Sequence, residues 1–368
     1  MARSSIPTEI GQLLIVGFDG TEMTPRLRAQ LTRLQPAGVI LFARNIATAS
    51  QTHRLLLDCQ ACVSTPLFTC VDMEGGRVDR LKHAIAPAPS AADVFATSDR
   101  KLFRKHGNLI GESCRAVGFN VDLAPVVDLA LEVSRNVMGS RAVSADPKQA
   151  IAYAREFLRG LASAGVVGAA KHFPGLGGAD LDTHLALPGV ARSWAELWAE
   201  DLYPYRVMRR ELPMVLVGHA SYPAVTHDRT PASLAKKWIS EVLRKKIGYR
   251  GLIVSDDLEM GGVLAAGSIE HVAVEHIAAG GDLCLICHQQ DLITRAFEAL
   301  TRQVEVDRKF ARRAKDSIKR VLLFKSKSRT FKRSIAPLDT AKVARLTRQL
   351  WEFSEQVRLQ GINRKGRA

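Results

Sequence analysis

The chain has 368 residues, enough for one large domain or two ordinary ones, and its 46% hydrophobic and 24% charged residues are typical of a soluble globular protein. No apolar run approaches the ~20 residues that a membrane-spanning helix needs, and the N-terminus lacks the pattern of an export signal. We therefore expect a cytoplasmic protein without a transmembrane segment. The net charge of +15 is concentrated at one end, since residues 325–368 carry 12 Lys and Arg against 3 Asp and Glu.

Short apolar runs typical of buried strands recur along the chain, with helical patterns between them. The eight predicted strands are residues 13–18, 38–42, 67–71, 121–127, 166–170, 214–217, 252–254 and 283–287. The helical patterns are residues 48–63, 99–117, 147–164, 193–210, 234–247, 269–279 and 292–303. Eight strand–helix units predict an α/β protein with a (β/α)8 TIM-type barrel. A doubly wound open sheet is disfavoured because no GxGxxG follows the first strand.

The C-terminal part of the chain differs in composition from the barrel. We expect residues 1–324 to form the catalytic barrel, with its last helix at 306–324, and residues 325–368 to form a basic extension that is helical over 340–359. Such a run is usually solvated, and its attraction to nucleic acid, anionic lipid or an acidic polymer is unspecific. No specific nucleic-acid partner is expected, and we expect a monomer.

Six cysteines in a chain of this length indicate reduced thiols rather than a disulfide scaffold. Two CxxC pairs raise the question of zinc. Cys59 and Cys62 fall in a helical pattern, whereas Cys284 and Cys287 fall in a predicted strand, where residues three apart point to opposite faces. Buried structural thiols are therefore favoured, and neither a metal nor an organic cofactor is expected.

Polar residues follow the predicted strands, at the edge where barrel enzymes place their chemistry. Each has an ordinary alternative: one of Asp256 and Asp257 is expected to cap a helix, His219 can be a hydrogen-bonded core residue, and Arg77 and Arg80 can lie on an exposed turn. Together, however, they predict a pocket for a small substrate rich in hydroxyl groups, such as a sugar. The set comprises Asp72–Arg80, Asp128, Asn136–Arg141, Lys171, His172, His219 and Ser255–Met260.

The segment from Lys171 to His184, KHFPGLGGADLDTH, is the most informative part of the sequence. Asp182 and His184 can form a couple in which the carboxylate orients the imidazole and stabilises its protonated form. Three glycines precede the couple, and their conformational freedom favours a loop that closes over the substrate.

With these residues in view, the chain resembles the bacterial β-N-acetylglucosaminidases of glycoside hydrolase family 3, the single-domain type used in cell-wall recycling. Four motifs carry the resemblance in family order, over about residues 8–300. One departure is Ala142–Ala145, which replaces the usual residues after Arg141 at the edge of the site. The four motifs are Asp72–Arg80 (DxEGGRVxR), Asn120–Asp128 (NxDxAPVxD), Lys171–His184 and Ser255–Met260 (SDDLxM).

The resemblance implies a role for each matched residue. Asp256 would be the nucleophile and His184 the acid/base, oriented by Asp182. Retention through a glycosyl-aspartate intermediate would then release terminal β-linked N-acetylglucosamine from muropeptide fragments in peptidoglycan recycling. The residues that would hold the sugar ring are Asp72, Arg80, Arg141, Lys171 and His172.

Other functions stay open at this point. A different family 3 β-glycosidase is disfavoured by the Asp182–His184 loop, and an N-acetylglucosamine phosphorylase is conceivable because a neutral imidazole base does not repel phosphate. A non-catalytic barrel that binds an anionic polymer through its basic tail has no chemical need for Asp182, His184 and Asp256 together.

Overall fold

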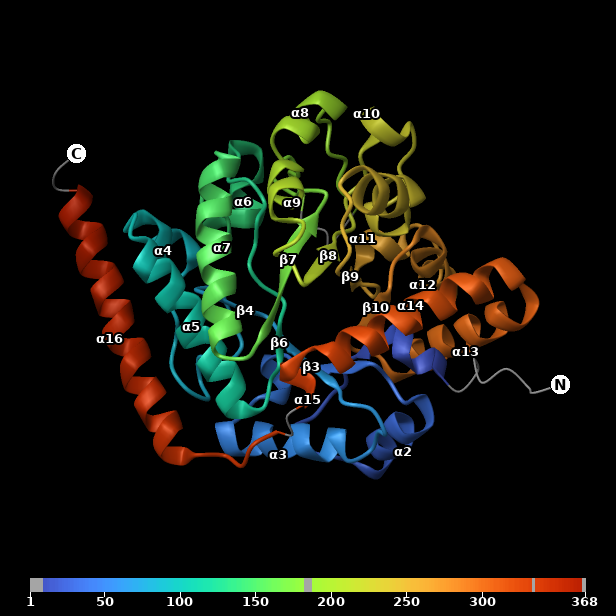
Figure 1. Cartoon of the computed structure of the whole chain (residues 1–368), viewed down its shortest axis with the longest axis horizontal. Helices are drawn as coiled ribbons and strands as arrows, with labels where there is room; N and C mark the ends of the chain where they lie inside the picture. The colour runs from blue at the N-terminus through green and yellow to red at the C-terminus, as the bar shows by residue number, and fades with distance from the viewer. Residues whose placement is uncertain (1–8, 182–186, 333–334, 366–368) are drawn as a thin grey trace.

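The computed structural model describes residues 9–181, 187–332 and 335–365, and its centre is a closed barrel of eight parallel strands (Figure 1). The strands neighbour one another in the order β1-β10-β9-β8-β7-β6-β3-β2. The (β/α)8 prediction is confirmed, because each barrel strand falls on a predicted apolar run. The barrel strands are β1 (Leu14–Val16), β2 (Gly38–Ile40), β3 (Phe68–Val71), β6 (Val121–Asp122), β7 (Val167–Phe173), β8 (Met214–Val217), β9 (Leu252–Asp257) and β10 (Leu283–Ile286).

Helices surround the barrel and join consecutive strands. The α-helices are α2 (Pro25–Leu34), α3 (Ala49–Gln60), α4 (Ala91–Ala96), α5 (Arg100–Val117), α6 (Arg135–Met138), α7 (Pro147–Ser163), α8 (Trp194–Ala199), α9 (Tyr203–Met208), α10 (Pro223–Thr226), α11 (Gly261–Leu264), α12 (Ile269–Ala279), α13 (Gln290–Val306), α14 (Arg308–Lys327), α15 (Arg329–Lys332) and α16 (Thr340–Lys365). The π-helix η6 (Lys237–Lys246) and the short helices η1 (Ile10–Leu13), η2 (Ala43–Asn45), η3 (Glu132–Ser134), η4 (Gly139–Arg141) and η5 (Ala232–Leu234) complete the set.

Local sequence signals explain where the main helices begin. The Asp146 side chain accepts a hydrogen bond from the Lys148 N–H and precedes Pro147 at the first position of α7. Thr24 and Pro25 start α2 in the same way, so this helix, absent from our predictions, had a readable signal.

Two predictions of local structure were wrong, and one small element was missed. The helix expected over 193–210 is two helices, α8 and α9, because Pro204 has no N–H with which to continue the hydrogen bonds of α8, and it lies in the first turn of α9 instead. The strand expected over 121–127 ends at Asp122, and Pro125 follows. A small hairpin of β4 (Met73–Gly75) and β5 (Val78–Asp79) was not predicted.

Two strands extend beyond their predicted ends and carry polar residues. Strand β7 continues through Lys171 and His172 to Phe173, and β9 continues through Asp256 to Asp257. These side chains therefore stand on the barrel strands themselves. A strand holds a side chain more rigidly than a connecting loop does.

The interior and the outside of the barrel form separate hydrophobic cores. Cys287 packs in the interior core and Cys284 in the outer one, which confirms that this CxxC pair points to opposite faces of its strand. All six cysteines are buried and free of disulfides, and burial raises the pKa of the Cys284 and Cys287 thiols. In the outer core α5 and α7 cross so closely that a Cβ atom on Gly107 would lie 2.1 Å from the Phe157 carbonyl oxygen.

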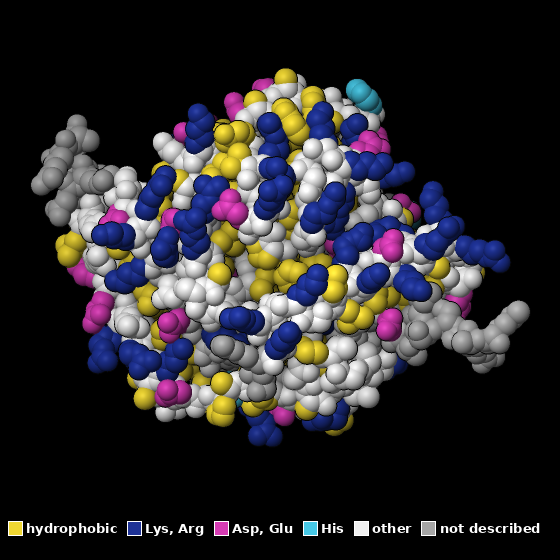
Figure 2. Space-filling model, viewed as in Figure 1, with side chains coloured by type: hydrophobic (Ala, Val, Ile, Leu, Met, Phe, Trp, Pro, Cys, Tyr) yellow, Lys and Arg dark blue, Asp and Glu magenta, His cyan; other side chains and the backbone are white. Residues whose placement is uncertain are grey.

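The basic C-terminal segment is mostly helical, with residues 335–339 outside any helix. Helix α14 carries nine Lys and Arg against one Asp, and α16 packs along α5 and α4 through Leu346, Leu350 and Phe353 (Figure 1). On the face that presents α7 and α14, Lys and Arg clearly outnumber Asp and Glu (Figure 2). In the described part of the chain, no helix combines the length and the apolar character needed to cross a membrane.

Candidate active site

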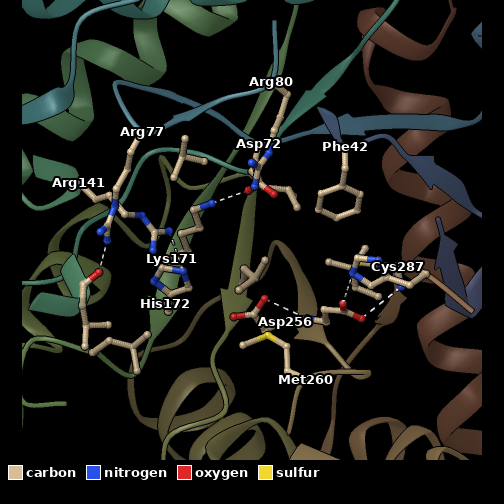
Figure 3. Close-up of a pocket in the computed structure, with 18 of the residues that line it drawn as sticks. Phe42, Asp72, Arg77, Arg80, Arg141, Lys171, His172, Asp256, Met260 and Cys287 are labelled. Carbon is tan, nitrogen blue, oxygen red and sulfur yellow. Dashed lines mark hydrogen bonds and ion pairs between the residues drawn. The ribbon is translucent and has the colours of Figure 1, made fainter. Parts of the chain in front are cut away.

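A cavity of about 320 Å³ opens at the carboxyl ends of the barrel strands (Figure 3). Six of the eight predicted site residues line it together, although they come from distant parts of the sequence. The other two, Asp182 and His184, lie outside the described residues. The six are Asp72, Arg80, Arg141, Lys171, His172 and Asp256.

A buried network of charges forms one wall of the cavity. Lys171 Nζ lies 2.6 Å from Asp72 Oδ1 and 2.7 Å from Glu74 Oε1. Arg141 makes a bidentate pair with Glu74, with Nε 2.7 Å from Oε2 and Nη2 2.8 Å from Oε1. Two carboxylates thus hold two cations in fixed positions, with donors and acceptors beside the cavity.

The pKa shifts favour the charged forms of Glu74 and Lys171. Burial alone would raise the pKa of Glu74, but the charges of Lys171 and Arg141 lower it well below its usual range. Burial alone would lower the pKa of Lys171, but the negative charges of Asp72 and Glu74 raise it above its ordinary value. Glu74, Lys171 and Arg141 are therefore charged across the neutral range, and each lies beside a charge of opposite sign.

His172 is held by Asp128, which lies between β6 and η3. The imidazole Nδ1 lies 2.6 Å from Asp128 Oδ2, and the backbone N–H of His172 donates to the same oxygen at 3.0 Å. The other oxygen accepts the backbone N–H of Leu176 at 2.7 Å. One carboxylate thereby fixes the ring and the start of the glycine-rich segment, and leaves His172 Nε2 3.4 Å from Arg141 Nη2.

Asp256 stands near the end of β9, on the floor of the cavity (Figure 3). Its Oδ1 accepts the backbone N–H of Asp257 at 2.9 Å. Burial favours the neutral acid, but His172, His219, this hydrogen bond and Lys171 together lower its pKa. An ionised carboxylate at this position is suited to attack an electrophilic carbon or to stabilise a developing cation.

The neighbouring Asp257 has a structural task instead. Its Oδ1 accepts the backbone N–H groups of Glu259 at 3.1 Å and Cys287 at 3.2 Å, so Asp257 caps a turn. The helix cap expected of the Asp-Asp pair is wrong, because the next helix, α11, begins after Met260. His219 is fully buried, with Nδ1 2.7 Å from Ser233 Oγ and Nε2 2.9 Å from the Asp257 carbonyl oxygen. Through this contact His219 holds the backbone of the residue that follows Asp256.

The opposite wall contains residues that the sequence did not single out. The rings of Phe42 and His288 stack with centroids 5.4 Å apart, and His288 Nε2 lies 3.3 Å from Asp257 Oδ2, a contact that raises the pKa of His288. The Arg80 guanidinium lies 5.7 Å from the Phe42 ring centre, and within the described chain its buried Nε has no hydrogen-bond partner. This wall offers an aromatic face and a cation to a ligand.

Glu74 and Asp128 belong to the set of polar residues predicted from the sequence, but their roles were not predicted. Both lay within recognised motifs but had no role assigned. Alternation along an extended segment could have placed Glu74 on the same side as Asp72, two residues earlier. Among residues 9–181, 187–332 and 335–365, no group of three His, Cys, Asp or Glu side chains could hold a metal ion.

Comparisons with known proteins agree with this geometry. The family model for the glycosyl hydrolase family 3 N-terminal domain matches residues 5–323. A beta-hexosaminidase of Stenotrophomonas maltophilia (strain K279a) is 34% identical over 295 residues, which cover 78% of this chain and 87% of that protein. A beta-hexosaminidase of Pseudomonas aeruginosa (strain LESB58) is 35% identical over 290 residues, covering 78% and 86%.

The fold comparison leads to the same family. A family 3 beta-N-acetylglucosaminidase from Paenibacillus sp. str. FPU-7 superposes with a TM-score of 0.88 at 31% identity, covering 96% of this chain and 69% of that one. With a barrel that places the family motifs around one cavity, a matching family model and relatives above 30% identity, the chain belongs to glycosyl hydrolase family 3.

Proposed function

We propose that this protein is a retaining exo-β-N-acetylglucosaminidase. The observation that carries the proposal is the placement of Asp256: a half-buried carboxylate with a lowered pKa, on a rigid strand, lining the same cavity as Asp72, Lys171 and Arg141. Beta-hexosaminidases among the relatives support the same activity.

In the first step, an Asp256 oxygen attacks the anomeric carbon while the bond to the leaving oxygen breaks. His184 donates a proton to that oxygen, so the aglycone departs as a neutral alcohol. A glycosyl-aspartate remains. The charges of His172, His219 and Lys171 and the Asp257 N–H favour the ionised form of this half-buried nucleophile.

In the second step, His184 accepts a proton from water, the water oxygen attacks the same carbon, and the bond to Asp256 breaks. Two inversions leave the configuration unchanged. An imidazole has an ordinary pKa of ~6.5, close to neutrality, so His184 can serve in both steps, and Asp182 would orient it.

The charged wall is suited to hold the sugar. Asp72 can accept hydrogen bonds from hydroxyl groups, and Lys171, Arg141 and Arg80 can donate them. Glu74 lies behind this wall and holds Lys171 and Arg141 in place. His172, fixed by Asp128, can contribute its Nε2. The Phe42 ring supplies an apolar surface on the opposite side for the carbon–hydrogen face of a ring.

We further propose that the natural substrate is a muropeptide fragment in the cytoplasm, cleaved during peptidoglycan recycling. The resemblance of the Lys171–His184 segment to enzymes of that role supports this proposal. A muropeptide panel would test it: release of N-acetylglucosamine from the fragments supports the substrate, and cleavage of chitin oligomers alone contradicts it.

The first experiment is release of 4-nitrophenol from 4-nitrophenyl N-acetyl-β-D-glucosaminide by the wild type, Asp256→Asn and His184→Ala. Activity that collapses in both variants supports the assignments. The same assay with glucoside and xyloside tests the other family 3 specificities. A sugar 1-phosphate formed in phosphate buffer would instead indicate a phosphorylase, and an inactive but folded wild type would contradict catalysis.

A further inference from the structure

The segment that carries Asp182 and His184 leaves the barrel after β7 and returns before α8, and its two ends lie against each other. A Cβ atom on Gly178, at the outgoing end, would lie 2.9 Å from both Val190 Cγ1 and Arg192 Cδ at the returning end. The Val190 N–H donates to the Ser221 carbonyl oxygen at 2.8 Å, after β8. The two ends are therefore packed together and tied to the barrel rim.

Arg192 connects these two ends to the junction between α8 and α9. Its Nε lies 2.9 Å from Asp201 Oδ2, and its Nη2 pairs with Glu200, just after α8. The Arg192 side chain is only 17% exposed, because its methylene groups pack on Gly178. One side chain thus contacts the outgoing end through its stem and the α8–α9 junction through its charge.

Asp201 supports the outgoing end from the other direction. It is fully buried, and a Cβ atom on Gly175 would lie 2.8 Å from Asp201 Cβ. Gly175 has φ +140°, and the Tyr222 hydroxyl donates to its carbonyl oxygen at 2.7 Å. The start of the segment is therefore held between Asp201 and Tyr222.

Burying the Arg192–Asp201 ion pair costs free energy that a purely structural contact would not need. No described residue donates a directed hydrogen bond to either Asp201 oxygen, so Arg192 provides its nearest compensating charge. Burial raises the pKa of Asp201 to about 7 despite that cation. Buried ion pairs stabilise a protein little compared with apolar side chains of the same volume. An ion pair does, however, fix the separation of the two segments that carry it, here 2.9 Å between Arg192 Nε and Asp201 Oδ2.

We infer that Arg192 and Asp201 are positioning residues for the acid/base: the pair holds together the two described ends, Gly175–Gly178 and Val190–Arg192, of the part of the sequence that carries it. The inference rests on the proposed function, which assigns the acid to His184. It adds two residues outside the cavity to the machinery of the same reaction.

The test exploits the fact that an acid matters only when the leaving group is poor. We would measure kcat/KM for two β-N-acetylglucosaminides, one of phenol and one of the much more acidic 2,4-dinitrophenol. The variants are Arg192→Met, Asp201→Asn, Arg192→Lys and His184→Ala. Arg295→Met, which breaks an exposed bidentate pair with Glu270 on α12, is the matched control.

We expect His184→Ala to show the full leaving-group effect. Arg192→Met and Asp201→Asn should lower kcat/KM about tenfold or more for the phenyl substrate and less than about threefold for the dinitrophenyl substrate. Arg192→Lys should retain most activity on both, and Arg295→Met should match the wild type. Circular dichroism and thermal melting check folding. If a single variant unfolds, the double variant Arg192→Met/Asp201→Leu, which leaves no unpaired charge, should show the same selective loss.

The outcomes separate the two proposals. Equal losses on both substrates, or no loss, in the Arg192 and Asp201 variants while His184→Ala keeps its leaving-group effect would overturn the positioning role alone. An inactive wild type, or a His184→Ala variant indifferent to the leaving group, would overturn the proposed function and this inference with it.

Discussion

Glu74→Gln tests whether the buried charge network stabilises the barrel rim as its geometry implies. The Glu74 side chain is 3% exposed and makes three contacts of 2.7–2.8 Å with Lys171 and Arg141. Glutamine keeps the shape but loses the charge and turns an amide N–H₂ group toward one of the cations. Removing one partner of a buried ion pair costs about 3–5 kcal/mol, because the remaining charge stays buried.

The size of the shift follows from the length of the chain. With an unfolding entropy of roughly 2.1 cal/mol/K per residue, each kcal/mol corresponds to about 1.3 °C in a chain of 368 residues. Glu74→Gln should therefore lower the melting temperature by about 4–6 °C. Because the pKa of Glu74 is lowered in the folded state, its contribution is complete above the unfolded value of ~4.3, and the loss should be constant from pH 6 to 8.

Circular dichroism melting at two pH values measures the shift, with Glu270→Gln as the control. Glu270 also makes a bidentate pair with an arginine, Arg295, but on the exposed surface between α12 and α13, so its loss should leave the melting temperature unchanged. A Glu74→Gln variant that melts with the wild type, or no earlier than Glu270→Gln, would refute the reasoning.

Three further predictions concern other parts of the molecule. Lys325 is buried, and burial lowers its pKa to about 7, against ~10.4 in the unfolded chain. Because the unfolded chain binds more protons between these two values, the free energy of unfolding should rise from pH 7 to 9 relative to that of Lys325→Met. Urea unfolding measures both, and an equal pH dependence in the wild type and the variant would contradict the prediction. Gly107→Ala should lower the free energy of unfolding by about 1–3 kcal/mol or more, because the added methyl group forces α5 away from α7. Gly361→Ala on α16, where the added methyl group meets open space, should leave the free energy of unfolding unchanged or raise it slightly in the same denaturation assay. Because the pKa of Asp256 is lowered, the acidic limb of the pH profile of kcat/KM should lie below about pH 4, and a limb near pH 5 would argue against Asp256 as the nucleophile.

The strands were predictable because burial on both faces leaves a local signature. Runs such as Met214–Val217 are continuously apolar, and no distant residue is needed to recognise them. The signals for helix starts at Pro25 and Pro147 are equally local. The break between α8 and α9 was missed because the amphipathic pattern runs through Pro204, and the pattern was given more weight than the proline.

Pairings across long sequence distances could not be predicted in this way. Glu74 and Arg141 are 67 positions apart, and Asp128 and His172 are 44 apart. The type and spacing of these residues marked them as polar groups at strand ends, but which carboxylate holds which cation depends on the packing of β3, β6 and β7 side by side. The stacked wall of Phe42 and His288 arises where the first strands meet the last, which only barrel closure brings about.

By itself, then, the sequence determined the eight-strand repeat, the barrel and the set of polar residues at its carboxyl edge, because hydrophobic periodicity and strand-end position are local properties. Only the tertiary structure decided that Asp256 is ionised beside His172 and Lys171, that Asp257 caps a turn, and that Arg192 reaches Asp201 beneath the glycine-rich segment. Those outcomes depend on distances and burial between segments far apart in the chain, which exist only once the barrel has closed.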